Sequence, residues 1–363
     1  MDWDMQKTSV VIVGAGFSAA ASDGKMPLMT GFFDQLQQQQ FPDLFAFVSE
    51  VGCTSRCPTI AKANVEKVLT ALEQMRTAPK RALCGALSTF SESHPDIQKQ
   101  LTDYTLHRLK SGACVEADNW AAQLLASCGF STTVISMNYD NLAESILSNR
   151  RGIHHGDINP NCPHCRMRLL LNAACSCNIR NDELNELWRG AVLKPHGSVA
   201  WRRCLNEGCC NHECLVADQH CRPFEPCKCN FCQTECAPVM VLPTMGKNLN
   251  EIKEIAVMWQ ACHAAIKDAE SILLFGFSLP QSDELLTQTI RTAVHEGRRL
   301  KRVGSIDLNP ESVLDRFEDC IPAGMDIEAN AFPVEIGQRP IWLNNADVDQ
   351  LNAQSLASPE ASI

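Results

Sequence analysis

A short run of β-branched residues that ends in a glycine turn constrains the fold of this 363-residue chain more than any other feature. Residues 8–15 (TSVVIVGA) lack the alternation of a half-buried strand, which is typical of a strand buried on both faces of a parallel sheet. Glycine lets the backbone approach a phosphate closely, and a helix is predicted to begin around 18–22. Because Ala19 stands in place of the third glycine of a GxGxxG pattern, a tight turn without a ligand remains an alternative. The turn itself contains Gly14, Ala15, Gly16, Phe17 and Ser18.

Predicted strands and helices alternate along the rest of the chain. Further strands are predicted at 132–137, 191–194, 239–242, 271–275 and 302–307. Helices are predicted at 32–40, 64–75, 81–87, 96–109, 117–128, 141–147, 250–268 and 282–293. The alternation predicts an α/β fold, a Rossmann-like parallel sheet with helices on both faces. We expect residues 1–150 and 238–343 to form it, with a helical insertion at about 40–128 and a polar C-terminal tail at 344–363.

The chain has twenty cysteines, and thirteen of them fall between Cys162 and Cys236. No secretory leader is expected before the first strand, which favours metal ligation over a disulfide framework. We therefore predict that residues 151–237 form a cysteine-rich zinc-binding module with one to three structural Zn²⁺ ions. An iron–sulfur cluster uses the same ligands and remains an alternative. One predicted ligand set is Cys162, Cys165, Cys175 and Cys177, and the second is Cys204, Cys209 or Cys210, Cys229 and Cys232.

Polar side chains follow two of the other predicted strands. Asn138 and Asp140 follow the strand at 132–137, and His196 follows the strand at 191–194. An Asn amide both donates and accepts hydrogen bonds, so it can hold a ribose hydroxyl or a water, and His is the usual general base near neutral pH. Taken alone, each motif is explained more simply, by a helix cap at Asp140 and by a structural histidine at His196.

Two weaker motifs end the strands at 271–275 and 302–307. Gly276 and Ser278 form a turn of small residues that could pack against a phosphate or a ribose, and Asn309 could reach an adenosine. Ligands bind at the carboxyl ends of parallel strands, so all of these motifs are expected to meet in one cleft.

The order of these motifs resembles that of the sirtuin superfamily, and specifically the divergent sirtuin-like branch found in bacterial NAD-consuming defence proteins. Sirtuins have a GAG turn with a Ser, an Asn–x–Asp motif, an HG motif, a zinc ribbon, a G–S turn and a late Asn, and this chain has them in that order across roughly 8–310. The resemblance implies NAD⁺ as the substrate, with the N–H groups of the first turn on its pyrophosphate. The implied catalytic residues are Asn138, His196 and Asp140, and the implied NAD⁺-binding residues are Gly14, Ala15, Gly16, Phe17, Ser18, Gly276, Ser278 and Asn309.

Three departures from the sirtuin deacylases bear on the expected activity. After the glycine turn, GKMPLMTGFF keeps Pro27 but lacks the Asp-Phe-Arg of deacylases, and Met137 replaces the usual Gln before the Asn. The later segment VMVLPTMGK lacks their acyl-peptide loop. The resemblance therefore implies an NAD⁺ hydrolase that cleaves the nicotinamide–ribose bond to nicotinamide and ADP-ribose. A protein deacylase or ADP-ribosyltransferase is one alternative, and a non-catalytic nucleotide-sensing scaffold is another.

Composition limits the partners that this chain is expected to have. A net charge of −10 does not favour nucleic-acid binding, and the absence of a run of about 18 apolar residues argues against a transmembrane helix. We expect a cytoplasmic protein without membrane contact. The resemblance implies a homo-oligomer or a separate activating protein, and a role in antiviral (anti-phage) defence.

Overall fold

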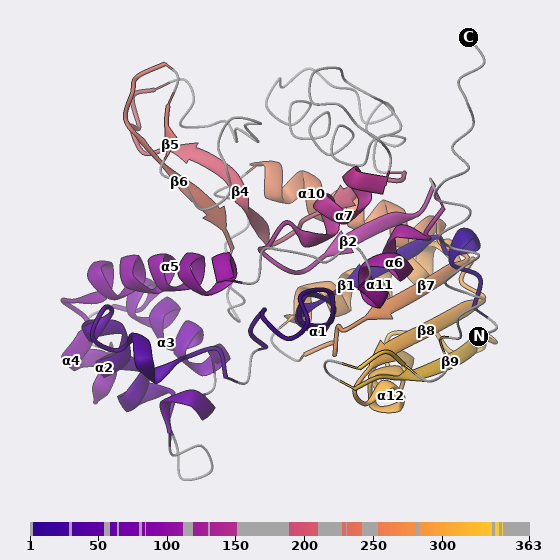
Figure 1. The fold of residues 1–363 in the computed structure, drawn as a ribbon, viewed down its shortest axis with the longest axis horizontal. Coiled ribbons are helices and arrows are strands. Elements are labelled where there is room, and N and C mark those ends of the chain that lie inside the picture. Colours follow the sequence, from indigo (N-terminus) through magenta and orange to yellow (C-terminus); the bar gives the residue numbers. More distant parts are fainter. Residues whose placement is uncertain are drawn as a thin grey trace.

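The chain forms one six-stranded parallel sheet, a helical unit beside it and a small antiparallel sheet (Figure 1). The strand order of the main sheet is β3-β2-β1-β7-β8-β9. Its strands are β1 (Val10–Val13), β2 (Thr133–Ser136), β3 (Val192–Leu193), β7 (Ser271–Phe275), β8 (Arg302–Asp307) and β9 (Glu328–Pro333). This computed structural model describes residues 3–28, 31–53, 59–63, 65–79, 82–83, 85–111, 119–129, 131–150, 189–209, 227–229, 231–241, 253–280, 283–335, 338–340 and 343.

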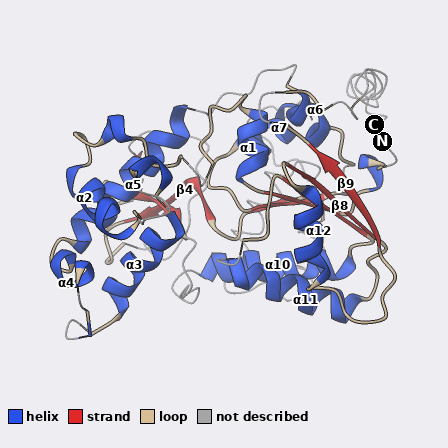
Figure 2. Cartoon of the chain, turned by 90° about the horizontal axis from the view of Figure 1, so that it is seen from below, coloured by secondary structure: helices blue, strands red, loops and turns tan. Residues whose placement is uncertain are grey.

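Side chains of the central strand β1 alternate between two cores. Val10 and Ile12 pack with one group of helices, whereas Val11 and Val13 pack with another, and all four are fully buried. Figure 2 shows helices on both sides of the sheet. One core includes α10 (Lys253–Asp268), α11 (Glu284–Gly297) and α12 (Pro310–Glu318), and the other includes α1 (Ala15–Ala21), α6 (Trp120–Ala126) and α7 (Leu142–Arg150). The predicted Rossmann-like sheet with helices on both faces is therefore confirmed.

The order of the strands places a switch point at β1. From β1 the chain passes to β2 and then β3 on one side, and it later fills β7, β8 and β9 on the other side. Because every pairing in this sheet is parallel, the carboxyl ends of all six strands lie along one edge. In such sheets the crevice at the switch point is where ligands bind.

The helical unit between β1 and β2 has a hydrophobic core of its own. Its helices are α2 (Pro42–Val51), α3 (Val65–Thr77), α4 (Ala86–Phe90) and α5 (His94–Ser111). Aromatic rings of Phe33, Phe41 and Phe45 surround Tyr104 in this core. Helix α6 packs in the core of the main sheet and not in this core. The separate helical unit therefore ends before α6 and is shorter than the insertion predicted at about 40–128.

Several predicted elements differ from the structure. The helix predicted at 32–40 is wrong, since only Gln35–Gln37 form a 3-10 turn there and the aromatic residues before it pack around Tyr104. The helix predicted at 81–87 is displaced to α4. Helices α2 and α12 and the half-exposed edge strand β9 were not predicted.

The strand predicted at 239–242 belongs to a different sheet from the one expected. It is the end of β6 (Glu235–Met240), which pairs antiparallel with β4 (Gly197–Cys204) and with β5 (Cys227–Lys228). Gly197 permits this arrangement because its φ is +83° and an added Cβ would lie 2.2 Å from the carbonyl oxygen of Val239.

Among the helices of the described residues, none combines the length and the apolar character needed to cross a membrane.

Gly276, just after β7, is expected to be the least replaceable glycine of the sheet edge. Its φ is +58°, and an added Cβ would lie 2.0 Å from the backbone nitrogen of Phe17. Gly276→Ala should lower the free energy of unfolding by about 3 kcal/mol or more, because backbone overlap adds to the strain of positive φ. The matched control is Gly324→Ala, with φ +83° and no atom within 4 Å, which should cost about 1 kcal/mol. Urea unfolding of both variants measures the difference, and equal losses would contradict the packing described.

Candidate functional site

A cavity of about 430 Å³ opens at the carboxyl edge of the main sheet. Its volume lies within the range of small-molecule sites, about 300–1,000 Å³. The predicted site residues that line it are Gly14, Ala15, Gly16, Ser18, Asn138, Asp140, His196, Gly276 and Ser278. Most of the strand-end motifs therefore meet in one cleft, with the exception of Asn309, and the role of each residue stays a prediction.

Two predicted binding residues lie elsewhere. The ring of Phe17 is buried and packs edge-on against Phe275 at a centroid distance of 5.0 Å. Asn309 is exposed, precedes α12 and is not among the residues lining the cavity. The strand end that carries Asn309 does reach the cavity, through Asp307 and Leu308.

The two glycine turns at the cavity floor bind each other through their backbones. The N–H of Gly16 donates to the carbonyl oxygen of Gly276 at 2.9 Å, and the N–H of Gly14 donates to Phe275 at 3.1 Å. The N–H groups of Phe17 and Ser18 donate to the carbonyl of Gly14, at 3.0 and 3.4 Å. In this conformation these four N–H groups are already engaged, which differs from the expectation that they hold a pyrophosphate.

Asn138 is held in one orientation by two hydrogen bonds. Its Nδ2 donates to the carbonyl oxygen of Gly14 at 2.7 Å and to Oγ of Ser18 at 2.8 Å. Both bonds use the amide nitrogen, so Oδ1 is the atom left to accept a hydrogen bond from a ribose hydroxyl or a water.

Asp140 combines two functions that the sequence left as alternatives. Its Oδ1 accepts from the N–H of Leu142 at 3.0 Å at the start of α7, as a helix cap does. Its Oδ2 accepts from Oγ of Ser18 at 2.7 Å. Asp140 is therefore linked to Asn138 through the hydroxyl of Ser18, with which both side chains form hydrogen bonds.

A buried lysine that forms an ion pair also holds the backbone of Asp140. Nζ of Lys194, which is fully buried, donates to the backbone carbonyl oxygen of Asp140 and lies 3.0 Å from Oε1 of Glu144. Burial raises the pKa of Glu144, and the Lys194 ammonium opposes this shift. The sequence signal for this pair was Lys194, a charged residue directly after the apolar residues of β3, and the sequence prediction did not use it.

His196 lies between two aromatic rings and a carboxylate. It follows β3, and its ring centroid is 6.4 Å from that of Tyr139 and 5.9 Å from that of Trp259. Its Nε2 lies 3.4 Å from Oδ1 of Asp283, and both side chains are buried. Asp283 was missed by the sequence reasoning because it stands at the start of a helix, where an Asp is usually a cap.

The charges and the apolar surface of the cavity are unevenly distributed. Among the described residues that line it, the carboxylates are Asp140, Asp283, Asp307 and Glu335, and none is a Lys or an Arg. The helical unit contributes an apolar wall that includes Phe32, Val65, Leu69, Leu101 and Leu109. A ligand that develops positive charge near the carboxylates would be stabilised there.

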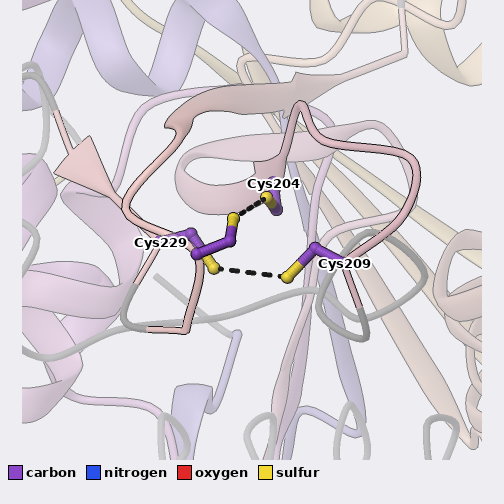
Figure 3. Close-up of side chains that lie close together, drawn as sticks. Cys204, Cys209 and Cys229 are labelled. Atoms are coloured by element: carbon purple, nitrogen blue, oxygen red, sulfur yellow. Dashed lines mark hydrogen bonds between the residues drawn. The ribbon is translucent and has the colours of Figure 1, made fainter.

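Four cysteines of the second predicted set come together at the end of the antiparallel sheet (Figure 3). The sulfur atoms of Cys204, Cys209, Cys229 and Cys232 all lie within 4.8 Å of one another. The Sγ–Sγ distances are 3.4 Å for Cys204 and Cys232 and 3.7 Å for Cys209 and Cys229. Zinc–sulfur bonds of about 2.3 Å in a tetrahedron need sulfur separations of about 3.8 Å, so this donor set fits a structural Zn²⁺.

Hydrogen bonding favours the thiolate form at two of these four cysteines, whereas burial raises the pKa of the Cys204 thiol. The side chain and N–H of Thr234 lower the pKa of the Cys232 thiol to about 6. Backbone N–H groups of Cys232 and Phe231 lower the pKa of Cys229. Thiolates are the form that ligates metal. The first predicted set, Cys162, Cys165, Cys175 and Cys177, lies outside the described residues.

Comparison with known proteins gives structural matches only. No protein-family model and no curated protein matches the chain. A Sir2 homologue–NAD complex is 13% identical, covers 97% of this chain and 91% of its own, and has a TM-score of 0.35. A mutant Sir2 homologue in complex with 2′-O-acetyl-ADP-ribose is 14% identical over 100% of both chains, with a TM-score of 0.41. A Sir2–p53 peptide–NAD⁺ complex is 13% identical, covers 96% and 93%, and has a TM-score of 0.38. These scores are low, so the fold described above rests on strand order and register.

Replacing one thiolate of the four-cysteine cluster should remove a zinc ion. Protein with Cys204→Ser or Cys229→Ser is expected to contain about one zinc fewer per chain than the wild type, because a structural site needs all four ligands. Inductively coupled plasma mass spectrometry of the purified proteins measures this. Cys53→Ser, a half-buried cysteine outside the cluster, is the control and should keep the wild-type content. An unchanged zinc content in both cluster variants would contradict the assignment.

Proposed function

We propose that this chain is a sirtuin-like NAD⁺ hydrolase that releases nicotinamide and ADP-ribose. The observation that carries the proposal is that one cavity at the switch point of the sheet is lined both by an oriented amide, that of Asn138, and by a buried imidazole, that of His196. The choice of NAD⁺ as the substrate comes from the order of the sequence motifs, which resembles that of NAD-consuming sirtuin-like proteins.

The proposed reaction breaks the bond between the nicotinamide nitrogen and C1′ of the ribose. The bonding electrons go to the nicotinamide nitrogen, which is cationic in NAD⁺ and leaves as a neutral group without an acid. Positive charge develops at C1′, where the buried Asp140 would stabilise it. Oδ1 of Asn138 would hold a ribose hydroxyl or the attacking water. His196 would take the proton of that water as its oxygen bonds to C1′.

Zinc in the four-cysteine cluster would be structural in this account. All four of its ligands would come from the protein, which leaves no position for water or substrate. The cluster would hold together β4, β5 and β6, and the first residue of β4, Gly197, follows His196 directly.

The second candidate activity is NAD-dependent deacylation or ADP-ribosyl transfer. The observation that favours it is the apolar wall of the cavity, because Phe32, Val65 and Leu101 could also receive an acyl chain. Mass spectrometry of the products separates the candidates: ADP-ribose without an acceptor, O-acyl-ADP-ribose with an acyl-lysine peptide, or no product from a nucleotide-sensing scaffold. The role in antiviral defence and activation by assembly or by a separate protein remain predictions from the resemblance.

Nicotinamide release should depend on both central side chains. His196→Ala and Asn138→Ala are each expected to lower kcat by about 10²-fold or more, since a general base alone contributes about 10²–10⁴-fold. Chromatography of nicotinamide after incubation with NAD⁺ measures release, and far-ultraviolet circular dichroism checks the fold. His263→Ala, a half-buried histidine of α10 paired with Glu296, is the control and should retain wild-type release. Wild-type release from both cavity variants would refute the assigned roles.

The carboxylate of Asp307, which lines the cavity, predicts a preference for NAD⁺ over NADP⁺. Asp307 ends β8, and such an acid at a strand end accepts a hydrogen bond from the ribose 2′-hydroxyl and repels a 2′-phosphate. NAD⁺ should bind at least about 10-fold more tightly than NADP⁺, and Asp307→Asn should narrow this ratio. Calorimetry of both nucleotides tests it, with the exposed Asp315→Asn as the control. An unchanged ratio in Asp307→Asn would show that Asp307 does not set the preference.

A further inference from the structure

The contact between His196 and Asp283 joins two elements that are distant in the sequence. His196 follows β3, and Asp283 precedes α11 on the other half of the sheet. The side chains are 3% and 8% exposed, and Nε2 lies 3.4 Å from Oδ1. Both residues line the cavity. Burying a carboxylate is costly unless it is paired, so the position of Asp283 is explained by its partner.

Asp283 also lacks the usual function of an aspartate at its position. It is the N-cap residue of α11, yet its side chain makes no capping hydrogen bond. An N-cap Asp normally accepts from the N–H groups of the first turn and stabilises a helix by about 1 kcal/mol. The helix forgoes this stabilisation, and the carboxylate is placed beside the imidazole instead.

We propose that Asp283 is the positioning residue of the candidate general base, holding His196 with Nε2–H toward the carboxylate and leaving Nδ1 as the basic nitrogen. This inference rests on the proposed NAD⁺ hydrolysis and states how the general base of that reaction is oriented. Nδ1 takes a proton from water while the water oxygen bonds to C1′ and the C1′–nitrogen bond breaks. The imidazolium that results is stabilised by the Asp283 carboxylate until the proton passes to solvent.

Among the described residues, the neighbours of His196 named above other than Asp283 are uncharged or paired with other groups. Tyr139, from the turn after β2, donates its hydroxyl to the carbonyl of Val241 at 2.6 Å, and burial raises its pKa, so the phenol stays neutral. Trp259, from α10, is an uncharged ring. In strand β6, Val239 and Met240 pair with the first two residues of β4, directly after His196, and neither carries a charge. The ammonium of Lys194 is bound to Asp140 and Glu144.

The test compares Asp283→Asn with Glu284→Gln. Glu284 is the next residue of α11 and is exposed, so its replacement removes the same charge without touching the imidazole. The readout that needs no turnover is the titration of the His196 imidazole by nuclear magnetic resonance, with its signal assigned by its loss in His196→Gln. A nearby carboxylate favours the charged imidazolium, so Asp283→Asn should lower the pKa of His196 and Glu284→Gln should leave it unchanged.

Kinetics supply a second readout of the same pair. Asp283→Asn should lower kcat for nicotinamide release by about 10²-fold or more, with KM for NAD⁺ nearly unchanged. Because the base form of a histidine with a lower pKa persists to lower pH, the acidic limb of kcat against pH should also move to lower pH. A purely structural role would lower kcat equally at every pH and would leave that limb in place.

Each outcome of these measurements decides the inference. A His196 titration that is the same in Asp283→Asn and in the wild type overturns it, whatever the activity. A shifted titration supports it even where release needs an activator. Absence of NAD⁺ binding to the wild type by calorimetry would instead overturn the proposed hydrolysis, and the pair would then stand as a property of the cavity alone.

Discussion

The backbone contact between two glycine turns is the constraint on which the rest of the site depends. The N–H of Gly16 reaches the carbonyl of Gly276 at 2.9 Å, and a Cβ on either residue would overlap the other turn. This contact locks the end of β1 against the end of β7 at the switch point of the sheet. It also fixes the carbonyl of Gly14, which orients Asn138. Close backbone packing between the two turns thereby positions a polar residue of the site.

The side chains of the site form two supported groups rather than a set of separate residues. One runs from Lys194 through Asp140 and Ser18 to Asn138, by hydrogen bonds that cross from β3 to β1. The other is the pair of His196 and Asp283, which joins the two halves of the sheet. Each group rests on charges that burial would make costly if they were not paired. The site is therefore oriented before any ligand binds, as efficient catalysis requires.

The sequence predicted those parts of the molecule that short-range patterns determine. Strand β7 (SILLF) matches its predicted range because its apolar run is nearly continuous, and the second cysteine set was found from its spacing. Strand β8 (RVGSID) also matches its predicted range, although Val303 and Ile306 are its only apolar side chains of any size. Strand β9 (EANAFP) is half exposed and carries no such pattern. The contact of Asp283 with His196 depends on how β3 and α11 are placed in space, which no local spacing encodes. The hydrogen bonds from the N–H groups of Gly14 and Gly16 to Phe275 and Gly276 likewise depend on the distant strand β7.

The most direct test of this account is a structure of the protein determined with ADP-ribose bound. The account predicts that the ligand lies in the cavity at the carboxyl ends of β1 and β7, with its terminal ribose within hydrogen-bond reach of Asn138 and His196 and its adenosine ribose toward Asp307. ADP-ribose bound elsewhere on the molecule, or no binding at saturating concentration, would contradict the claim that the strand-end motifs build a dinucleotide site.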